Sequence, residues 1–232
     1  VLPYEQYALC IGMYGKDEDF YSLKGVVEEL FRVLGIKDPI FAGEADLGAF
    51  HPGRCARISV ISGENAVLID APFDADDIMT ELGGKKLCAI LLTHGHVDHM
   101  SAAEDLRKST GCKVYVSEED KPFLTDSRHS LADYFSMPFY PCTESQTFKD
   151  GDELEIAEMK FRVVSTPGHT PGSVCFVHED VIFTGDTLFN GSIGRDFGWS
   201  CYRNIIDSIG KLYALGKNYK ILPGHGEASD LY

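Results

Sequence analysis

Short apolar runs rich in β-branched residues recur from about residue 58 onwards and alternate with segments of helical periodicity. Runs of this kind, bounded by Gly, Pro, Asn and Asp, are typical of buried strands. The predicted strands are Ile58–Ile61, Ala66–Ile69, Leu87–Leu92, Lys113–Val116, Leu154–Ile156, Phe161–Val164, Val174–Val177 and Val181–Thr184. The predicted helices between them are Ala75–Leu82, Met100–Lys108 and Tyr202–Leu215. A turn signal, Ser62-Gly63-Glu64-Asn65, joins the first two strands, so we expect a mixed rather than an all-parallel sheet.

The N-terminal part has a different pattern of apolar and polar residues. Leu23–Leu34 has the apolar stripe of an amphipathic helix and ends at Gly35, a typical helix stop. A stretch punctuated by Gly and Pro follows it and reads as a connecting loop around one short strand. We therefore expect a small α+β segment over residues 1–58 and one larger domain over residues 59–232.

The net charge and the cysteine content indicate which binding partners and which cellular compartment to expect. The formal net charge of -15 repels phosphate backbones and anionic membranes, so we expect neither nucleic acid nor a membrane as a partner. No apolar run approaches the roughly 18 residues of a membrane span. The scattered cysteines form no C-x-x-C pair, which favours a reducing cytoplasm; they are Cys10, Cys55, Cys88, Cys112, Cys142, Cys175 and Cys201.

A dense cluster of metal-binding residue types follows the predicted strand Leu87–Leu92. His94, His96, Asp98 and His99 fall within six residues, with Gly95 leaving the turn unhindered. Imidazole nitrogen and carboxylate oxygen are common zinc ligands, so this segment could serve two adjacent cations. Alternation along the turn would direct His94 and His96 one way and leave Asp98 and His99 for a second cation.

Three further donors stand in the same kind of context. His169, Asp186 and His225 each lie on a glycine-bearing turn that follows a short apolar strand. Sites at one rim of a sheet draw their side chains from such turns. The alternative is a surface loop that happens to be rich in histidine, and the repeated context argues against it.

The order His-x-His-x-Asp-His, then a distant His, Asp and His, resembles the metallo-β-lactamase superfamily from about Ile58 to the C-terminus. The resemblance implies an αββα sandwich and a hydrolase with two divalent cations, expected to be zinc, with iron or manganese as alternatives. It places His94, His96 and His169 at the first metal and Asp98, His99 and His225 at the second. Asp186 would bridge the two, and Asp98 would also orient the attacking hydroxide.

Two segments, Thr184–Phe189 and Gly191–Asp196, resemble the glyoxalase II-like hydrolases. This implies a thioester substrate of the hydroxyacylglutathione type or a related ester. The full-length thioesterases of that group hold glutathione with a C-terminal helical domain, for which there is no room before Tyr232, so glutathione specificity is not carried over. Arg195 could neutralise a substrate carboxylate, or it could pair with Asp196.

Other candidates have plainer interpretations. We expect His51, His129 and His178 to be surface or locally hydrogen-bonded histidines rather than metal ligands. Cys175 and Cys201 are expected to be small buried hydrophobic residues, because no base lies beside them in the sequence.

The N-terminus resembles a different family. Ile11–Lys16, Asp19–Glu28 and His51–Ile58 are similar to a piece of the β chain of phenylalanyl-tRNA synthetase. A fragment of this size carries no synthetase activity, so the resemblance transfers no function, and a fusion or engineered chimera is the preferred explanation. Ala56–Ile61 would then supply the first strand at the edge of the hydrolase sheet.

Two other functions are compatible with the motifs. A mononuclear iron persulfide dioxygenase shares the outer fold and uses only His, His and Asp at one iron. A non-catalytic chimeric scaffold would retain the ligands without a competent pocket. Metal content and a substrate panel separate these from a hydrolase, because fold alone does not choose among activities.

Overall fold

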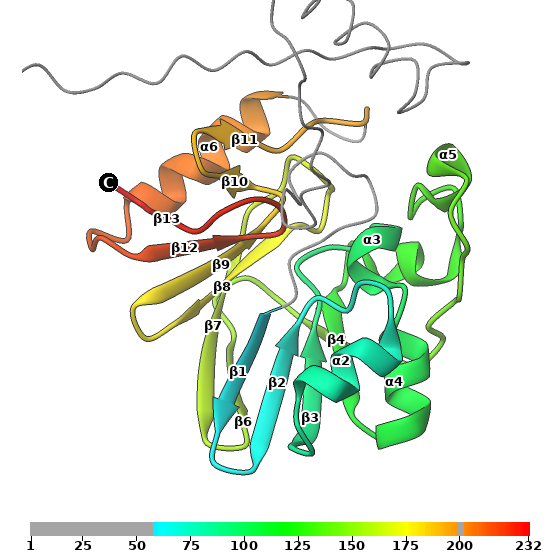
Figure 1. The fold of residues 1–232 in the computed structure, drawn as a ribbon. Helices are drawn as coiled ribbons and strands as arrows, with labels where there is room; N and C mark the ends of the chain where they lie inside the picture. The colour runs from blue at the N-terminus through cyan, green and yellow to red at the C-terminus, as the bar shows by residue number, and fades with distance from the viewer. Residues whose placement is uncertain (1–57, 199–201) are drawn as a thin grey trace, which may run out of the picture. The chain divides into compact units, whose positions relative to one another are not determined.

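In the described part of the chain, two β-sheets lie face to face, with helices outside them (Figure 1). The computed structural model describes residues 58–198 and 202–232. The first sheet has the strand order β1-β2-β3-β4-β5, with β1 antiparallel to β2 and the remaining neighbours parallel. Its strands are β1 (Ile58–Ser62), β2 (Asn65–Ile69), β3 (Lys86–Leu91), β4 (Lys113–Ser117) and β5 (Gln146–Phe148).

The second sheet has the order β13-β12-β9-β8-β7-β6 and is antiparallel except between β9 and β12. Its strands are β6 (Glu153–Ile156), β7 (Met159–Ser165), β8 (Val174–His178), β9 (Val181–Gly185), β12 (Lys220–Pro223) and β13 (Ser229–Asp230). A small two-stranded sheet joins β10 (Leu188–Phe189) to β11 (Ser192–Ile193). Both large sheets are thus mixed, as the hairpin signal and the parallel-type runs predict.

Helices cover the outer face of each sheet. Buried side chains of α2 (Ala75–Glu81) and α4 (Ala103–Thr110) pack on the first sheet, and those of α6 (Tyr202–Tyr213) pack on the second. Shorter helical turns are α3 (Val97–Met100), η2 (Lys121–Thr125) and α5 (Ala132–Phe135). None of the helices in the described ranges is long and apolar enough to cross a bilayer.

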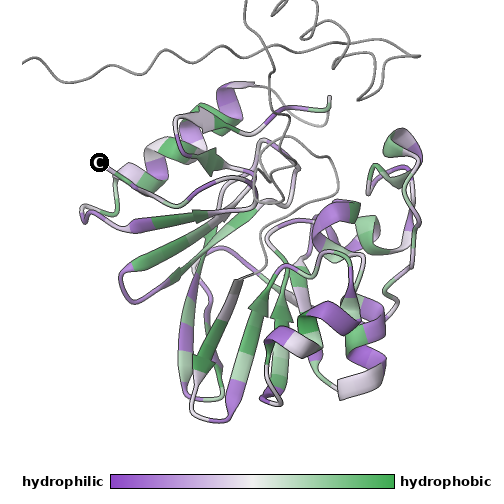
Figure 2. Ribbon diagram, viewed as in Figure 1, coloured by the Kyte–Doolittle hydropathy of each residue, from purple (hydrophilic) through white to green (hydrophobic). Residues whose placement is uncertain are grey.

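The alternation of side chains along the strands explains why these strands are apolar on both sides. In β2, Val67 and Ile69 join the core between the two sheets, whereas Ala66 and Leu68 face the helices of the first layer. Successive residues of a strand point to opposite faces, so a strand buried on both faces reads as a continuous apolar run. Figure 2 shows this apolar centre and the polar outer surfaces of the helices.

This architecture is the αββα sandwich that the resemblance predicts, and the prediction is confirmed. Ile58–Ser62 forms the edge strand β1, in agreement with the first strand expected at Ala56–Ile61. The predicted helix Leu23–Leu34, most of the segment 1–58, and the residues Cys10, His51, Cys55 and Cys201 lie outside the described residues.

The predicted helix Met100–Lys108 is wrong in detail, because the structure has two helices here, α3 and α4. In a continuous helix the His99 carbonyl would accept from residue 103, four positions on. Instead it accepts a 2.6 Å hydrogen bond from the Ala71 amide, and the Ala102 amide donates to the Ala71 carbonyl at 2.9 Å. The loop after β2 therefore interrupts the helix. Strands β5, β10, β11 and β13 are also absent from the strands predicted from the sequence, whereas β12 is the short apolar strand expected before His225.

Candidate metal centre

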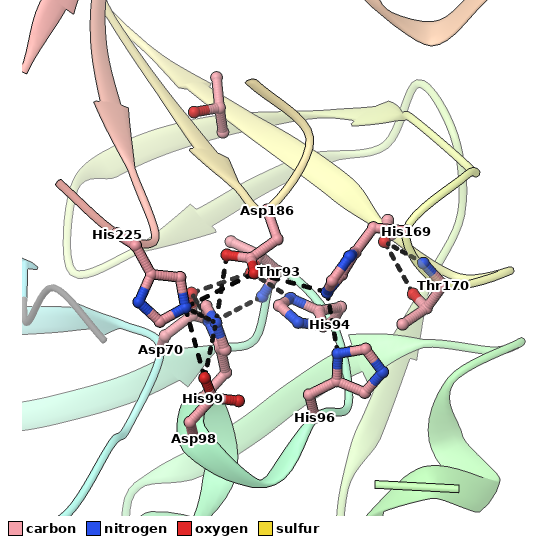
Figure 3. A network of polar contacts seen from close by, with 12 residues as sticks. Asp70, Thr93, His94, His96, Asp98, His99, His169, Thr170, Asp186 and His225 are labelled. Atoms are coloured by element: carbon pink, nitrogen blue, oxygen red, sulfur yellow. Dashed lines mark hydrogen bonds and ion pairs between the residues drawn. The ribbon is translucent and has the colours of Figure 1, made fainter. Parts of the chain in front are cut away.

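The candidate ligands lie where strands of both sheets end (Figure 3). The loop after β3 carries His94 and His96, and the helix α3 that follows it carries Asp98 and His99. The turns after β7, β9 and β12 carry His169, Asp186 and His225. The Val174 amide donates to the Thr93 carbonyl at 2.9 Å and so joins the rims of the two sheets. The site is therefore built on the ends of packed strands, which hold its loops in place.

Three imidazoles form a first group. His94, His96 and His169 are buried, and one ligand atom of each lies within 4.8 Å of the others. His96 Nδ1 lies 2.9 Å from His169 Nε2. His94 Nε2 is buried and has no hydrogen-bond partner in the described part of the chain. These nitrogens point toward a common position, as three ligands of one cation do.

A second group combines a carboxylate with two imidazoles, namely Asp98, His99 and His225. His225 Nε2 lies 3.3 Å from Asp98 Oδ2 and 3.4 Å from His99 Nε2. Asp186 lies between this group and the first one. Its Oδ1 is 3.3 Å from His99 Nε2, and its Oδ2 is 3.4 Å from His169 Nε2. Asp186 Oδ2 also lies 3.5 Å from His225 Nε2, so this one carboxylate contacts both groups.

Hydrogen bonds from neighbouring residues determine the tautomers of three of these histidines. Asp70 Oδ2 lies 2.9 Å from His99 Nδ1, and the Arg195 carbonyl lies 2.7 Å from His169 Nδ1. Because both oxygens accept, each Nδ1 carries the proton and each Nε2 remains a lone-pair donor toward the centre.

His94 follows the same logic through Thr93. The Thr93 hydroxyl donates to Asp70 Oδ2 at 2.9 Å and lies 3.1 Å from His94 Nδ1. The hydroxyl proton is already used, so Thr93 Oγ1 accepts from Nδ1–H, and Nε2 of His94 is left unprotonated. Histidine ligands of metals are commonly held by such partners on their second nitrogen.

The electrostatics of the chain also match a cation site. Burial lowers the pKa of His94, His96 and His169, and the neighbouring imidazoles add to this effect for His94 and His96. Burial would also lower the pKa of His225, but its hydrogen bond to Asp186 and the nearby carboxylate charges outweigh this effect and raise its pKa to about 10. Burial opposes ionisation of Asp186, yet the surrounding histidines hold its pKa well below the usual value. The neutral imidazoles of His94, His96 and His169 beside an ionised Asp186 are the forms that bind divalent metals.

The structure brings together all seven residues predicted as ligands: His94, His96, Asp98, His99, His169, Asp186 and His225. The eighth predicted site residue, Arg195, has its guanidinium over the Phe197 ring, 5.2 Å from the centroid. Phe197 in turn lies against His96 and His169, with ring centroids 5.6 and 5.7 Å apart. Arg195 is therefore beside the first group.

His129, His178 and Cys175, which we did not expect to bind a metal, have surroundings in the structure that agree with this expectation. His129 pairs with Asp126 at 3.2 Å, and His178 is hydrogen-bonded to the Lys160 carbonyl at 2.9 Å, as predicted for both. Cys175 is fully buried, which raises the pKa of its thiol to about 12 and confirms its role as a core residue.

Sequence reasoning missed Asp70 and Thr93, which orient the ligands. Asp70 Oδ1 accepts from the Thr93 amide at 2.7 Å, in addition to the bonds described above. The available signal was an acid directly after the apolar run Ala66–Ile69, the same strand-end context as the ligands themselves. The donor set and the unpartnered His94 Nε2 fit a pair of divalent cations.

The fold and the donor order agree with a comparison of the sequence with known families. Residues 56–225 match the family model described as Metallo-beta-lactamase superfamily. The chain belongs to this superfamily. Members of the metallo-β-lactamase superfamily use divalent metal ions for hydrolysis, and the His and Asp groups described above could hold such ions. A second model, Phenylalanyl tRNA synthetase beta chain CLM domain, matches residues 1–68, which confirms the predicted N-terminal resemblance.

Two curated proteins are similar in sequence to most of this chain. An uncharacterized protein of Mycobacterium leprae is 40% identical over 157 residues, covering 62% of this chain and 71% of that protein. The hydroxyacylglutathione hydrolase GloC of Haemophilus influenzae is 36% identical over 173 residues, covering 70% of this chain and 81% of that protein.

Solved structures of the metallo-β-lactamase superfamily are similar over most of the chain. BLEG-1, a B3 metallo-beta-lactamase, has a TM-score of 0.71 and 30% identity and covers 78% of this chain and 91% of its own. TTHA1623 in a di-iron-bound form has a TM-score of 0.70 and 29% identity. The match covers 79% of this chain and 93% of TTHA1623. The names of these similar proteins thus include a metallo-beta-lactamase and a hydroxyacylglutathione hydrolase, and one of the proteins was solved in a di-iron-bound form.

Proposed function

We propose that the chain is a metal-dependent hydrolase of acyl thioesters of the hydroxyacylglutathione type or of closely related esters. The observation that carries the proposal is the convergence of seven side chains, with His94, His99 and His169 each oriented by a partner on Nδ1 so that Nε2 faces the other candidate ligands. The likeness to GloC supports the choice of a thioester within the superfamily.

Two divalent cations, with zinc as the proposed metal, supply an activated water and polarise a carbonyl oxygen when bound. His94, His96 and His169 would hold one of them, and Asp98, His99 and His225 would hold the other. Asp186 contacts histidines of both groups and would set their separation. Asp98 lies 3.3 Å from His225 and would accept a hydrogen bond from the attacking water, which orients it.

A thioester suits this set of residues because its leaving group needs little assistance. A free thiol has a pKa of about 8.5, so a thiolate departs without a strong general acid. Arg195 is proposed to pair with a carboxylate of the substrate, since it lies on the first-group side with its guanidinium against Phe197. The ring of Phe197 would then border the acyl group beside His96 and His169.

The test combines metal analysis with a substrate panel on the purified full-length chain. We expect two metals per chain and release of thiol from a hydroxyacyl thioester. Activity should be lost on chelation and restored by added Zn²⁺. Lactone, β-lactam and phosphodiester substrates serve as controls for the other activities of the fold.

Two outcomes would replace the proposal with its alternatives. One iron per chain with oxygen-dependent consumption of a persulfide would identify a dioxygenase. Two bound metals with no turnover on the whole panel would identify a non-catalytic scaffold.

A further inference from the structure

Asp120 is a fully buried carboxylate that lies between two loops carrying candidate ligands. It stands between β4 and η2, on a segment that supplies none of the seven predicted ligands. Its Oδ2 accepts from the Gly95 amide at 2.9 Å and from the Thr170 hydroxyl at 2.7 Å, and its Oδ1 accepts from the Gly172 amide at 2.8 Å. In the sequence, Gly95 lies between His94 and His96. Thr170 directly follows His169 (Figure 3).

These three hydrogen bonds make up for the cost of removing the carboxylate from water, which is large when a buried charge has no partner. Burial raises the pKa of Asp120, whereas the bonds from Thr170, Gly95 and Gly172 act in the opposite direction. Since the carboxylate draws its three hydrogen bonds from both loops, it couples their positions.

The packing around Asp120 leaves little freedom for the two loops. A Cβ added to Gly172 would overlap Ser117 and the Asp120 carboxylate, and a Cβ added to Gly95 would overlap Phe123. The Asp120 amide is itself tied to Ser117 Oγ at 3.2 Å. The β4–η2 segment is therefore a tightly fitted support for both loops.

We propose that Asp120 is a positioning residue that joins the His94–His96 loop to the His169 loop and so sets the spacing of the three imidazoles of the first metal group. The inference rests on the ligand set of the proposed function but not on the identity of the ester hydrolysed. Asp70 acts differently, because it contacts His99 directly and reaches His94 through the Thr93 hydroxyl. Two buried carboxylates thus support the centre, Asp70 through the ligand side chains and Asp120 through the loops that carry them.

Asp120→Asn is the sharpest substitution, because asparagine has the same shape but replaces one acceptor oxygen with an NH₂ donor. In either orientation of the amide, that NH₂ group faces an N–H or O–H that now lacks an acceptor. Loss of a partner of this kind typically lowers metal affinity by about 10- to 100-fold.

The experiment measures Zn²⁺ affinity by chelator competition on the metal-free full-length protein in two backgrounds. His225→Ala leaves the first group intact, and His96→Ala leaves the second group intact. We expect Asp120→Asn to weaken Zn²⁺ binding by about 10- to 100-fold in the His225→Ala background. In the His96→Ala background the affinity should stay close to its parent value. A merely structural role would not separate the two.

Glu104→Gln is the matched control, since Glu104 is also a buried carboxylate but is paired with Arg107 and Lys108. It should leave Zn²⁺ affinity unchanged in both backgrounds. Thr170→Val removes a single donor to Asp120 and should give a smaller loss in the same background, which keeps the test decisive if Asp120→Asn does not fold.

Equal losses in the two backgrounds, or no loss with Asp120→Asn or Thr170→Val in the His225→Ala background, would overturn the inference while leaving the proposed function in place. Failure of the unsubstituted chain to bind Zn²⁺ at all would overturn both.

Discussion

At the scale of single residues, Asp98 has the most direct link to chemistry among the acids of the site. Its Oδ2 lies 3.3 Å from His225 Nε2 and 3.9 Å from His99 Nε2, so it belongs to the second group. We expect Asp98→Ala to lower kcat by about 100-fold or more, because both metal occupancy and the orientation of the water are affected. Elemental analysis and steady-state kinetics on the same preparation would measure both effects.

Asp105→Ala is a suitable control, because Asp105 is an exposed aspartate on α4. It should retain both activity and metal content. Full activity of Asp98→Ala with two metals per chain would contradict the role proposed for Asp98.

The residues that could be predicted at this scale are those whose chemistry is unusual. Several histidines and an aspartate within six positions are rare on a surface loop, so His94 to His99 stand out in the sequence. Asp120 could not be found in this way. It lies in the run Glu118-Glu119-Asp120-Lys121, which reads as a solvated face, and only the packing of Gly95 and Gly172 against it removes it from water.

At the scale of elements, the turns that follow the strands decide how closely the ligands approach one another. Gly224 lies at the end of β12, and its amide donates to the Gly185 carbonyl at 2.9 Å. A Cβ at Gly224 would overlap Asp186 Oδ1 and the His99 ring. The absence of a side chain here allows the turns after β9 and β12 to meet.

We therefore expect Gly224→Ala to separate Asp186 from His99 and to reduce both metal content and turnover by about 10-fold or more. Gly210→Ala is the matched control, because Gly210 lies within α6 and its added methyl group would meet open space. That control should keep full activity and gain about 0.5–1 kcal/mol in the free energy of unfolding. Wild-type metal content in Gly224→Ala would contradict the expectation.

The limits of prediction at this scale have a physical cause. Strand positions could be predicted from apolar runs, because strands such as β2 are buried on both faces and therefore have apolar residues at successive positions. The break between α3 and α4 did not, because it depends on hydrogen bonds with Ala71, far away in the sequence. Strand β5 has only one buried residue, Phe148, and so has little apolar pattern to detect.

At the scale of the whole molecule, the candidate ligands come from both sheets, so metal binding should stabilise the fold as a unit. A ligand that binds only the folded state stabilises it by about 4 kcal/mol when its free concentration is 1,000 times its Kd. We expect chelation to lower the Tm and the urea midpoint and added Zn²⁺ to restore them. His178→Ala should respond to chelation like the parent, whereas His94→Ala should respond less. Identical unfolding curves with and without chelator would argue against a metal centre that links the sheets.

Stability of the metal-free chain should also depend on pH. Burial lowers the pKa of His94 and His96, so these side chains stay neutral when folded but take up protons when unfolded below about pH 6.5. Protonation then favours the unfolded chain. We expect the free energy of unfolding to fall between pH 7 and pH 5.5, by up to about 1.4 kcal/mol per pH unit for each of them.

His225 has the opposite sign. Its pKa is raised to about 10, so the stability it contributes is present below about pH 6.5 and is lost as the pH rises toward 10. Urea unfolding at pH 5.5, 7 and 9 with chelator present would measure both limbs. His94→Asn should reduce the fall in unfolding free energy on the acid side and leave the change on the alkaline side as it is. A profile without any fall on the acid side would show that His94 and His96 are not held neutral.

What the sequence determined by itself was the class of fold, the positions of most strands and the identity of the candidate ligands, because periodicity and unusual donor residues are local properties. Tertiary structure alone decided which oxygens orient those ligands. Asp70 and Asp120 acquire their contacts only when loops distant in the chain meet at the rim of the two sheets. Hydrogen-bond partners of a buried carboxylate are set by packing in three dimensions, and no local pattern encodes that packing.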